Sequence, residues 1–485
     1  MRIRRAAALL IALIFCLSLA AGAEEAAVPN SELPMPKFLK NVAVHDPSII
    51  KAEDGLYYIF GSHMAAATST DLIDWKLISR DASNGGCTLV ENVQTQMKDA
   101  LNYAKTTTFW APDVVQLNNG TYAMYYCTCE GSSPLSTLGI AYAEKPEGPY
   151  VNQGIILRSG QSGYNANVYP NVVDPCTFYD KDGRLWMVYG SYSGGIYILE
   201  MDTETGFPLK GQLNNGLGKK LLGGNHARIE APYILYSPDT DYYYLFLSFG
   251  GLGANDGYNI RVCRSKTPDG PYEDARGQNM LNCKGRPGSF FNDPDYAPYG
   301  VKLMGGYEFL AAEGDKNKIT LAHRSPGHNS AYYDEETGRY FIVFHTRFAN
   351  SGESFQVRVH QMYMNEAGWP VISPLRYAGE MPETVDASLM PGAYKVLLHE
   401  RDINKVEHES KVATLNPDGT ITGAHEGTWE CADGANITLT LDGKTYTGVM
   451  HTALDASQKT WVTCISALDE EGAALWAIRA YSNYK

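Results

Sequence analysis

A pattern that returns along the chain constrains the fold more than any other feature. Pro47, Pro112, Pro175 and Pro232 each open an apolar run typical of a β-strand, at steps of 65, 63 and 57 residues. A turn signal, a second apolar run, a third run and a Gly or Pro turn follow each proline. A fifth copy without the proline covers residues 329–348. Five four-stranded units predict a five-bladed β-propeller rather than a sandwich.

Turn and linker signals divide the chain further. Asp54-Gly55, Asn119-Gly120 and Asp182-Gly183 predict hairpins within the units, because these residues tolerate positive φ. Residues 273–327 lack the repeat, which indicates an insertion before the fifth unit. The pattern ends near residue 375, and turn-forming residues fill a linker at about 376–392. Short alternating runs in residues 393–485 predict a small C-terminal β-barrel or sandwich domain.

The N-terminus has the pattern of a secretory signal peptide in residues 1–23. Arginines precede a short apolar stretch, and Ala21-Gly22-Ala23 forms a small-residue cleavage site. The stretch is too short for a retained membrane anchor, so we expect a secreted chain whose propeller domain spans residues 24–375. With 40 basic and 54 acidic residues the net charge is −14, which argues against nucleic acid and suits a neutral ligand.

Eight cysteines remain once Cys16, within the signal peptide, is set aside. None forms a C-x-x-C metal pair. Export permits disulfides, for which Cys431 with Cys464 and Cys263 with Cys283 are reasonable partners within one domain. Buried free thiols are the alternative, since Cys is a small core residue.

Three carboxylates precede these prolines in three different units. Asp46 and Asp174 stand directly before a proline, and Glu230 stands two residues before one, as Trp110 does in its own unit. The first strand of each propeller blade lines the central channel, so these side chains are expected to face one cavity. Proline restricts the preceding residue to an extended backbone, which predicts the direction of Asp46 and Asp174.

Three acids in one channel suit the hydrolysis of a glycosidic bond with inversion. One carboxylic acid protonates the leaving oxygen, and one carboxylate, roughly 6.5 to 9.5 Å away, activates a water on the opposite face of the sugar. A third negative charge raises the pKa of the proton donor. An Asp-Pro dipeptide alone is usually only a turn. The prediction therefore depends on finding acids at corresponding positions of several repeat units.

The residues around these acids resemble glycoside hydrolase family 43. The matching motifs are HDPSII, FWAPDV, VVDPCTFYD, RIEAPY and SPGHNSAYYD, over about residues 36–375, and they look most like those of its endo-α-1,5-L-arabinanases. The C-terminal module also resembles that of the two-domain extracellular members. The resemblance implies that Asp46 is the general base, Glu230 the general acid, and Asp174 the residue that tunes the donor's pKa and orients the substrate.

Other residues near the acids are candidates for substrate contacts. Trp110 shares the phase of Glu230, so its ring is expected to stack on a sugar face, the alternative being a core tryptophan. Asp113 lies on the other side of its proline and is expected to be structural or to orient its neighbours. The remaining candidates neighbour the acids or end second strands: His45, Arg228, Ser191 and, with a weaker signal, His63.

His328 lies in the motif Gly327-His328-Asn329-Ser330. A lone histidine is more often structural than a ligand, and calcium prefers oxygen donors. In the resembling arabinanases, however, this histidine binds a calcium ion in the channel with waters completing the shell. The resemblance therefore implies a calcium ion near His328, which would also alter the pKa values of the acids.

The sequence as a whole predicts a secreted inverting glycoside hydrolase that cleaves internal bonds of arabinan, with the substrate class resting on the resemblance. Two alternatives stay open: an exo-acting arabinofuranosidase or β-xylosidase of the same mechanism, for which the insertion would close one end of the groove, and a carbohydrate-binding propeller without catalysis. The C-terminal domain would bind polysaccharide or cover the propeller. It shows no aromatic cluster, which favours packing.

Overall fold

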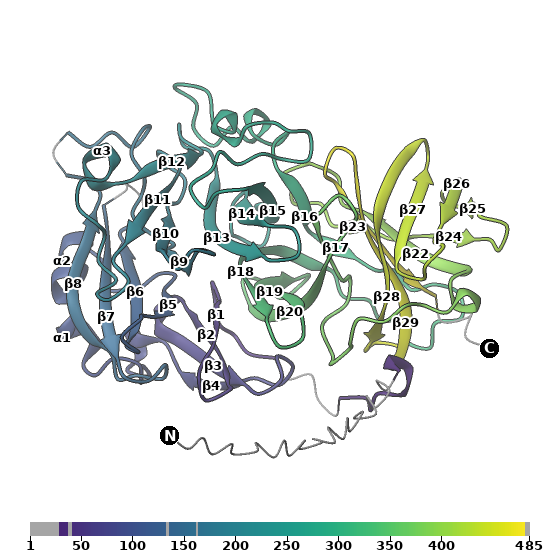
Figure 1. The fold of residues 1–485 in the computed structure, drawn as a ribbon, viewed down its shortest axis with the longest axis horizontal. Helices are drawn as coiled ribbons and strands as arrows, with labels where there is room; N and C mark the ends of the chain where they lie inside the picture. The colour runs from purple at the N-terminus through teal and green to yellow at the C-terminus, as the bar shows by residue number, and fades with distance from the viewer. Residues whose placement is uncertain (1–28, 37–40, 132–134, 162, 481–485) are drawn as a thin grey trace, which may run out of the picture.

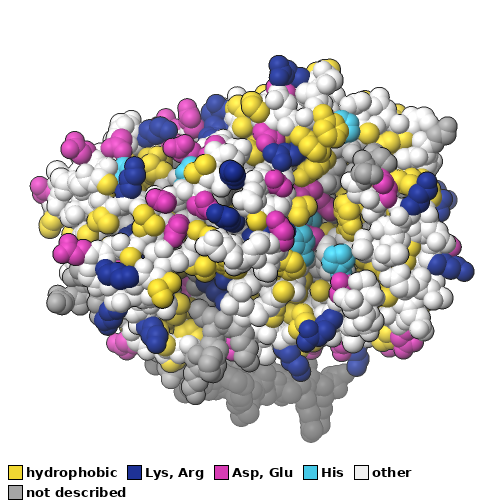
Figure 2. Space-filling model, turned by 180° about the vertical axis from the view of Figure 1, so that it is seen from behind, with side chains coloured by type: hydrophobic (Ala, Val, Ile, Leu, Met, Phe, Trp, Pro, Cys, Tyr) yellow, Lys and Arg dark blue, Asp and Glu magenta, His cyan; other side chains and the backbone are white. Residues whose placement is uncertain are grey.

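The computed structural model describes residues 29–36, 41–131, 135–161 and 163–480. Strands dominate and form a propeller with a closed barrel beside it (Figure 1). The predicted signal peptide, residues 1–23, lies outside the described residues. Among those that are described, no helix is long and apolar enough to cross a membrane. Figure 2 shows acidic and basic side chains interspersed over one face, with histidine side chains beside acidic ones near its middle.

The first three blades are four-stranded antiparallel sheets, each in simple up-and-down order. Their strands are β1 (Ser48–Lys51), β2 (Tyr57–Gly61), β3 (Ala65–Ser69) and β4 (Lys76–Ser79); β5 (Asp113–Gln116), β6 (Tyr122–Cys129), β7 (Ser136–Ala143) and β8 (Val151–Arg158); β9 (Cys176–Tyr179), β10 (Leu185–Tyr189), β11 (Ile196–Met201) and β12 (Lys219–Leu222). Hairpin turns at Gly55, Gly120 and Gly183 have positive φ, as their sequences predict.

The last two blades complete the circle. Their strands are β13 (Ile229–Ser237), β14 (Tyr242–Phe249), β15 (Asn259–Ser265) and β16 (Val301–Met304), then β18 (His323–Asp334), β19 (Arg339–Phe348), β20 (Phe355–Met364) and β21 (Pro370–Ile372). Helices are short and lie between strands: α1 (Val93–Gln96), α2 (Lys98–Ala104) and α3 (Leu213–Gly216), with 3-10 turns η1 (Asn30–Glu32), η2 (Ser62–Met64), η3 (Ala82–Asn84), η4 (Met280–Asn282), η5 (Asp293–Asp295) and η6 (Ala387–Leu389).

Contacts between the first strands close the ring. β1 contacts β5, β5 contacts β9, β9 contacts β13, β13 contacts β18, and β18 contacts β1. Apolar clusters fill the spaces between neighbouring blades: Phe60 of blade one packs with Met124 of blade two, and Val343 of blade five with Ile59 of blade one. The five-bladed propeller predicted from the repeat is confirmed.

The region expected to be an insertion belongs in part to the propeller. β16, the fourth strand of blade four, and β17 (Tyr307–Glu308) both lie within residues 273–327, and β18 begins at His323. The extra residues therefore form two segments, one between β15 and β16 that carries η4 and η5, and one between β17 and β18. The repeat was not visible in the sequence because β16 is only four residues long and follows β15, its partner in the sheet, after a long intervening segment of the chain.

The C-terminal unit is a closed barrel, one of the two forms expected. Its order is β22 (Gly392–Leu398), β24 (Lys411–Leu415), β25 (Thr420–Gly423), β26 (Gly427–Glu430), β27 (Asn436–Leu441), β28 (Lys444–Asp455), β29 (Thr460–Asp469) and β30 (Ala474–Arg479). Apolar side chains, including Tyr394 and Ile465, fill its interior. All eight cysteines among the described residues are free thiols, so neither of the disulfides considered from the sequence is formed.

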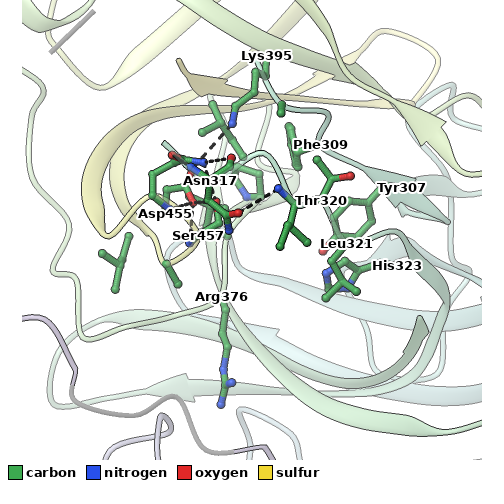
Figure 3. Close-up of a pocket in the computed structure, with 18 of the residues that line it drawn as sticks. Tyr307, Phe309, Asn317, Thr320, Leu321, His323, Arg376, Lys395, Asp455 and Ser457 are labelled. Carbon is green, nitrogen blue, oxygen red and sulfur yellow. Dashed lines mark hydrogen bonds and ion pairs between the residues drawn. The ribbon is translucent and has the colours of Figure 1, made fainter. Parts of the chain in front are cut away.

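The barrel is joined to blade five by backbone pairing and ion pairs. β23 (His408–Glu409), which lies between β22 and β24 in the chain, pairs in parallel with β17 and extends the sheet of blade five to six strands. Lys302 of blade four, 3% exposed, forms an ion pair with Asp402, whose side chain is 23% exposed. A pocket of about 350 Å³ lies at this junction, where Lys395 of the barrel points toward the loop that carries Asn317 (Figure 3).

Candidate active site

The predicted acids lie where first strands begin, but their backbone differs from the expectation. We expected proline to hold Asp46 and Asp174 extended. Both instead have left-handed conformations, with φ of 57° and 56°, and Ala231 before Pro232 has φ of 53°. Non-glycine residues adopt this region at a cost, and such strain gathers at functional sites. The tertiary packing of the ring therefore overrides the local preference.

The Asp46 carboxylate is buried and surrounded by imidazole rings. Its Oδ2 lies 2.7 Å from His45 Nδ1 and accepts a hydrogen bond from Ser62, and its Oδ1 lies 3.0 Å from His328 Nδ1. Burial by itself raises the pKa of Asp46, but the interactions with His328 and His45 outweigh it and lower the pKa well below 3.8. Asp46 is therefore a carboxylate at neutral pH.

The Glu230 carboxyl has the opposite tendency. Ser191 Oγ donates to Oε2 and Tyr258 Oη donates to Oε1, both at 2.8 Å. Burial raises the pKa of Glu230, and the charge of Asp46 adds to this, while His328 and the two hydroxyls lower it. The net pKa lies above the usual value, so Glu230 keeps a proton more readily than an exposed glutamate.

Asp174 shares the electrostatic environment of Glu230. Its Oδ2 accepts a hydrogen bond of 3.3 Å from the backbone N–H of Ala231, the residue that follows Glu230. Burial and the charges of Glu230 and Asp46 raise the pKa of Asp174 to about 7, against the lowering effect of His328. Asp174 and Glu230 therefore influence each other in both directions, because each carboxylate makes ionisation of its neighbour less favourable.

His328 occupies in blade five the position that Asp46 occupies in blade one, as their equivalent places in the strand registers show. Its φ is 44°, and its backbone N–H donates to Ser248 Oγ at 2.8 Å. Burial lowers the pKa of the imidazole, but Asp46, Asp174 and Glu230 raise it to about 9. Three carboxyl groups thus favour one positive charge at this position.

A group of residues close to His328 has the donors of a metal site. His45, Asp46 and His345 each offer one ligand atom within 4.8 Å of the others. His328, the ligand expected from the sequence, is not part of this group, although it contacts Asp46. Two of the three donors are imidazoles, whose bonds to neighbours fix which nitrogen is available.

The residues predicted to contact substrate lie in different environments. Ser191 and His45 directly contact the carboxyls of Glu230 and Asp46. Trp110 is partly buried against Cys127, Cys129 and Val173, with part of its surface exposed. The Arg228 guanidinium is bound by Asp293, to which Nε donates at 3.0 Å.

Asp113 forms a bridge between blades, in agreement with the structural role expected. Its Oδ1 accepts from Ser48 Oγ, and its Oδ2 accepts from the backbone N–H of Thr177 at 2.6 Å. Ser48 lies two residues after Asp46, and Thr177 three residues after Asp174. This buried carboxylate therefore fixes the strands that carry both acids, and burial raises its pKa to about 6.

Three functional neighbours were missed in the sequence: Ser62, His345 and Tyr258. The backbone N–H of Asp46 donates to His345 Nδ1 at 3.2 Å. The strand registers place His345, Ser62 and Ser248 at equivalent positions of the second strands of three blades. A polar residue that recurs at this position inside apolar runs could have identified Ser62 and His345 from the sequence. Tyr258 precedes a third strand and gives no such signal.

Gly327 allows Tyr258 to reach Glu230. A Cβ atom at Gly327 would lie 2.0 Å from Cδ1 of the Tyr258 ring. Taken together, the described residues put an ionised carboxylate and a carboxyl of raised pKa in one channel around one imidazole. This is the combination that acid and base catalysis at a glycosidic bond requires.

Comparisons with known proteins agree with this arrangement. The sequence model of Glycosyl hydrolases family 43 matches residues 38–294, and that of a C-terminal lipocalin-like domain matches residues 374–477. The extracellular endo-alpha-(1->5)-L-arabinanase 2 of Bacillus subtilis (strain 168) is 51% identical over 456 residues, covering 93% of this chain and 95% of the relative. The corresponding enzyme of Thermotoga petrophila is 46% identical and covers 90% of this chain and 93% of the relative.

Solved structures give the same result over 91% of the chain. A family 43 glycoside hydrolase from Bacillus licheniformis has a TM-score of 0.87 at 52% identity, covering 91% of this chain and 99% of its own. The endo-1,5-alpha-L-arabinanase of Thermotoga petrophila has a TM-score of 0.86 at 45% identity, with the same coverage. With the family match over more than half of its length, this chain belongs to glycosyl hydrolases family 43.

Proposed function

We propose that this protein is an extracellular inverting glycoside hydrolase that cleaves internal α-1,5-L-arabinofuranosidic bonds of arabinan, the neutral side chain of pectin. The observation that carries the proposal is the pairing of Asp46, whose pKa is low, with Glu230, whose pKa is raised, in the channel of a family 43 propeller. The two relatives that align with at least 90% of the chain are named as extracellular endo-arabinanases, which supports the substrate and the mode of cleavage.

Each acid has one task in the proposed reaction. Asp46 accepts a proton from a water molecule, whose oxygen attacks the anomeric carbon. Glu230 gives its proton to the glycosidic oxygen as the bond between that oxygen and the anomeric carbon breaks. The new bond forms on the face opposite to the leaving group, so the configuration inverts.

Asp174 supports the acid in this scheme. Once Asp174 is ionised, above its pKa of about 7, its carboxylate disfavours a second negative charge on Glu230 and so raises the pKa of the donor. We assign Trp110 to stacking on a sugar ring, because part of its surface is exposed beside Val173. Ser191 and His45 orient Glu230 and Asp46 while bordering the bound sugar. Arg228, held by Asp293, would contact the sugar chain from the rim.

A calcium ion is proposed at His328. The residues fit a cation, because Asp46 lies 3.0 Å from His328 and the negative charges of Asp46, Asp174 and Glu230 favour a positive charge there. The ion would take the place of the imidazole's proton, since a histidine ligand must be neutral. His328 would hold the ion, with His45, Asp46 and His345 as neighbouring donors. When bound, such an ion supplies a fixed positive charge that lowers the pKa of nearby groups.

The proposed division of the chain follows the sequence. Residues 1–23 are a signal peptide, residues 24–375 the catalytic propeller, and residues 393–485 the C-terminal domain after a linker at about 376–392. Secretion is supported by the names of the extracellular relatives. The ion pair between the buried Lys302 and the partly exposed Asp402 supports a packing role for the C-terminal domain.

The test is a product series on debranched linear arabinan with wild type and Glu230→Gln. Wild type is expected to release a ladder of oligosaccharides in the first minutes, and Glu230→Gln to lose turnover while still binding arabino-oligosaccharides in calorimetry. Arabinose as the sole early product would contradict internal cleavage. Full turnover by Glu230→Gln would remove Glu230 from the role of acid.

A further inference from the structure

Two neighbouring phenylalanines stand exposed on the segment between β15 and β16. Phe290 is 65% exposed and Phe291 is 41% exposed, and their ring centroids lie 4.1 Å apart. The His226 ring lies 4.8 Å from Phe290, and the Tyr192 ring lies 5.3 Å from Phe291 in an edge-on contact. Four rings therefore form a continuous patch, defined here as the aromatic patch, in which the two most exposed members have no polar atom.

The segment that carries the aromatic patch is fixed to blade four. Arg228 Nε, directly before β13, donates to Asp293 Oδ1 at 3.0 Å, and within the segment Arg286 Nε lies 2.7 Å from Asp295 Oδ1. Asn225 Nδ2 donates to Gly285 O at 2.9 Å. The exposed rings are therefore held in place, which lowers the entropy that a ligand must overcome on binding.

The aromatic patch is continuous with the candidate active site. Tyr192 directly follows Ser191, whose hydroxyl donates to Glu230 at 2.8 Å. His226 lies on the segment that leads into Glu230, and its backbone N–H donates to Ser193 O at 3.0 Å. A chain molecule that extends from Glu230 along this side would pass over the exposed rings.

The chemistry of the aromatic patch selects a neutral sugar chain as its occupant. Exposed apolar surface beside a cleft marks a binding site, because covering it removes apolar area from water. Phenylalanine faces offer no hydrogen bonds, but they suit the C–H faces of sugar rings. The net charge of −14 disfavours an anionic ligand.

We propose that Phe290, Phe291 and His226 form an aromatic subsite that binds arabinofuranose units of the polysaccharide outside the cleavage position. The inference rests on the proposed function, since it places the same substrate on a second surface. The subsite makes long chains better substrates than short ones, because only a long chain reaches from Glu230 to the exposed rings.

The test compares the Phe290→Ala/Phe291→Ala variant with wild type on linear arabinan and on arabinotriose. The ratio of kcat/KM for the polymer to kcat/KM for the trisaccharide is expected to fall about tenfold, because the loss of the subsite raises KM for the polymer. Phe207→Ala, which removes another exposed phenylalanine (37% exposed) from a turn of blade three, is the matched control and should keep the wild-type ratio. Oligosaccharide binding by the double variant in the Glu230→Gln background, measured by calorimetry, reports affinity without turnover.

The outcomes separate the two proposals. An unchanged ratio in the double variant, with wild type active on arabinan, overturns the aromatic subsite and leaves the proposed function. A wild type that does not cleave arabinan overturns both. Self-association of wild type that the double variant loses, with the ratio unchanged, would identify a second copy of this chain as the occupant and overturn the sugar subsite.

Discussion

Removing the hydroxyl of Tyr258 should change the pH dependence of the reaction in one direction. Tyr258 donates to Glu230 Oε1 at 2.8 Å from a fully buried position, and this hydrogen bond favours the ionised carboxylate. A hydrogen bond to a charged group is worth about 1.5 to 3 kcal/mol. At about 1.36 kcal/mol for each pKa unit, Tyr258→Phe should move the alkaline limb of kcat/KM upward by about one to two pH units.

The assay is the pH profile of kcat/KM on linear arabinan for wild type, Tyr258→Phe and Tyr272→Phe. Tyr272 is an equally buried tyrosine whose hydroxyl donates to Pro268 O at 2.8 Å, so it controls for the general loss of a buried hydrogen bond. The acidic limb, set by Asp46, should stay in place in both variants. An alkaline limb that stays at its wild-type position in Tyr258→Phe, or that moves down, would refute the assignment of Glu230 as the acid.

Two further predictions concern stability. Burial raises the pKa of Asp113 from 3.8 to about 6, so the folded state binds this proton more tightly than the unfolded state, and its ionisation costs stability as the pH rises through this window. Between pH 4 and pH 7, the free energy of unfolding of Asp113→Asn in urea should therefore fall by about 2 kcal/mol less than that of wild type, and an equal fall in both proteins would contradict this. Asp402→Asn removes the ion-pair partner of the buried Lys302 and should lower the free energy of unfolding by about 1.5 to 3 kcal/mol, because Asp402 itself is partly exposed. Asp402→Leu combined with Lys302→Met should cost much less by the same measurement.

The propeller and its three acids could be predicted because each depends on a repeated local pattern. Asp46 and Asp174 share one phase of the repeat, and His328 occupies the same place in blade five without the proline. The repeated pattern does not predict the backbone conformation of the residues at that position. The local rule for a residue before proline predicts an extended backbone, and the ring instead imposes positive φ on Asp46 and Asp174.

The residues that were not predicted do not lie at the repeated position where the first strands begin. Tyr258 lies before the third strand of blade four and contacts Glu230 only because Gly327 of blade five leaves space for its ring. The contact therefore requires both a tyrosine at position 258 and a glycine at position 327, which lie 69 positions apart in the sequence. The exposure of Phe290 was equally hidden, since it depends on ion pairs that hold a segment without strand periodicity.

The charge of each carboxyl group in the site depends on its distance from His328 as well as on its burial. Three carboxyl groups lie in the channel and favour a positive charge at His328, which a proton on the imidazole supplies in the ion-free protein and the proposed calcium ion would supply when bound. An isolated buried charge is costly, so the first negative charge goes to Asp46, which contacts His328 directly. Asp174 and Glu230 then ionise less readily, because a second negative charge has no equal partner. One imidazole thus separates the base from the acid, and a change at His328 should disturb both limbs of the pH profile together.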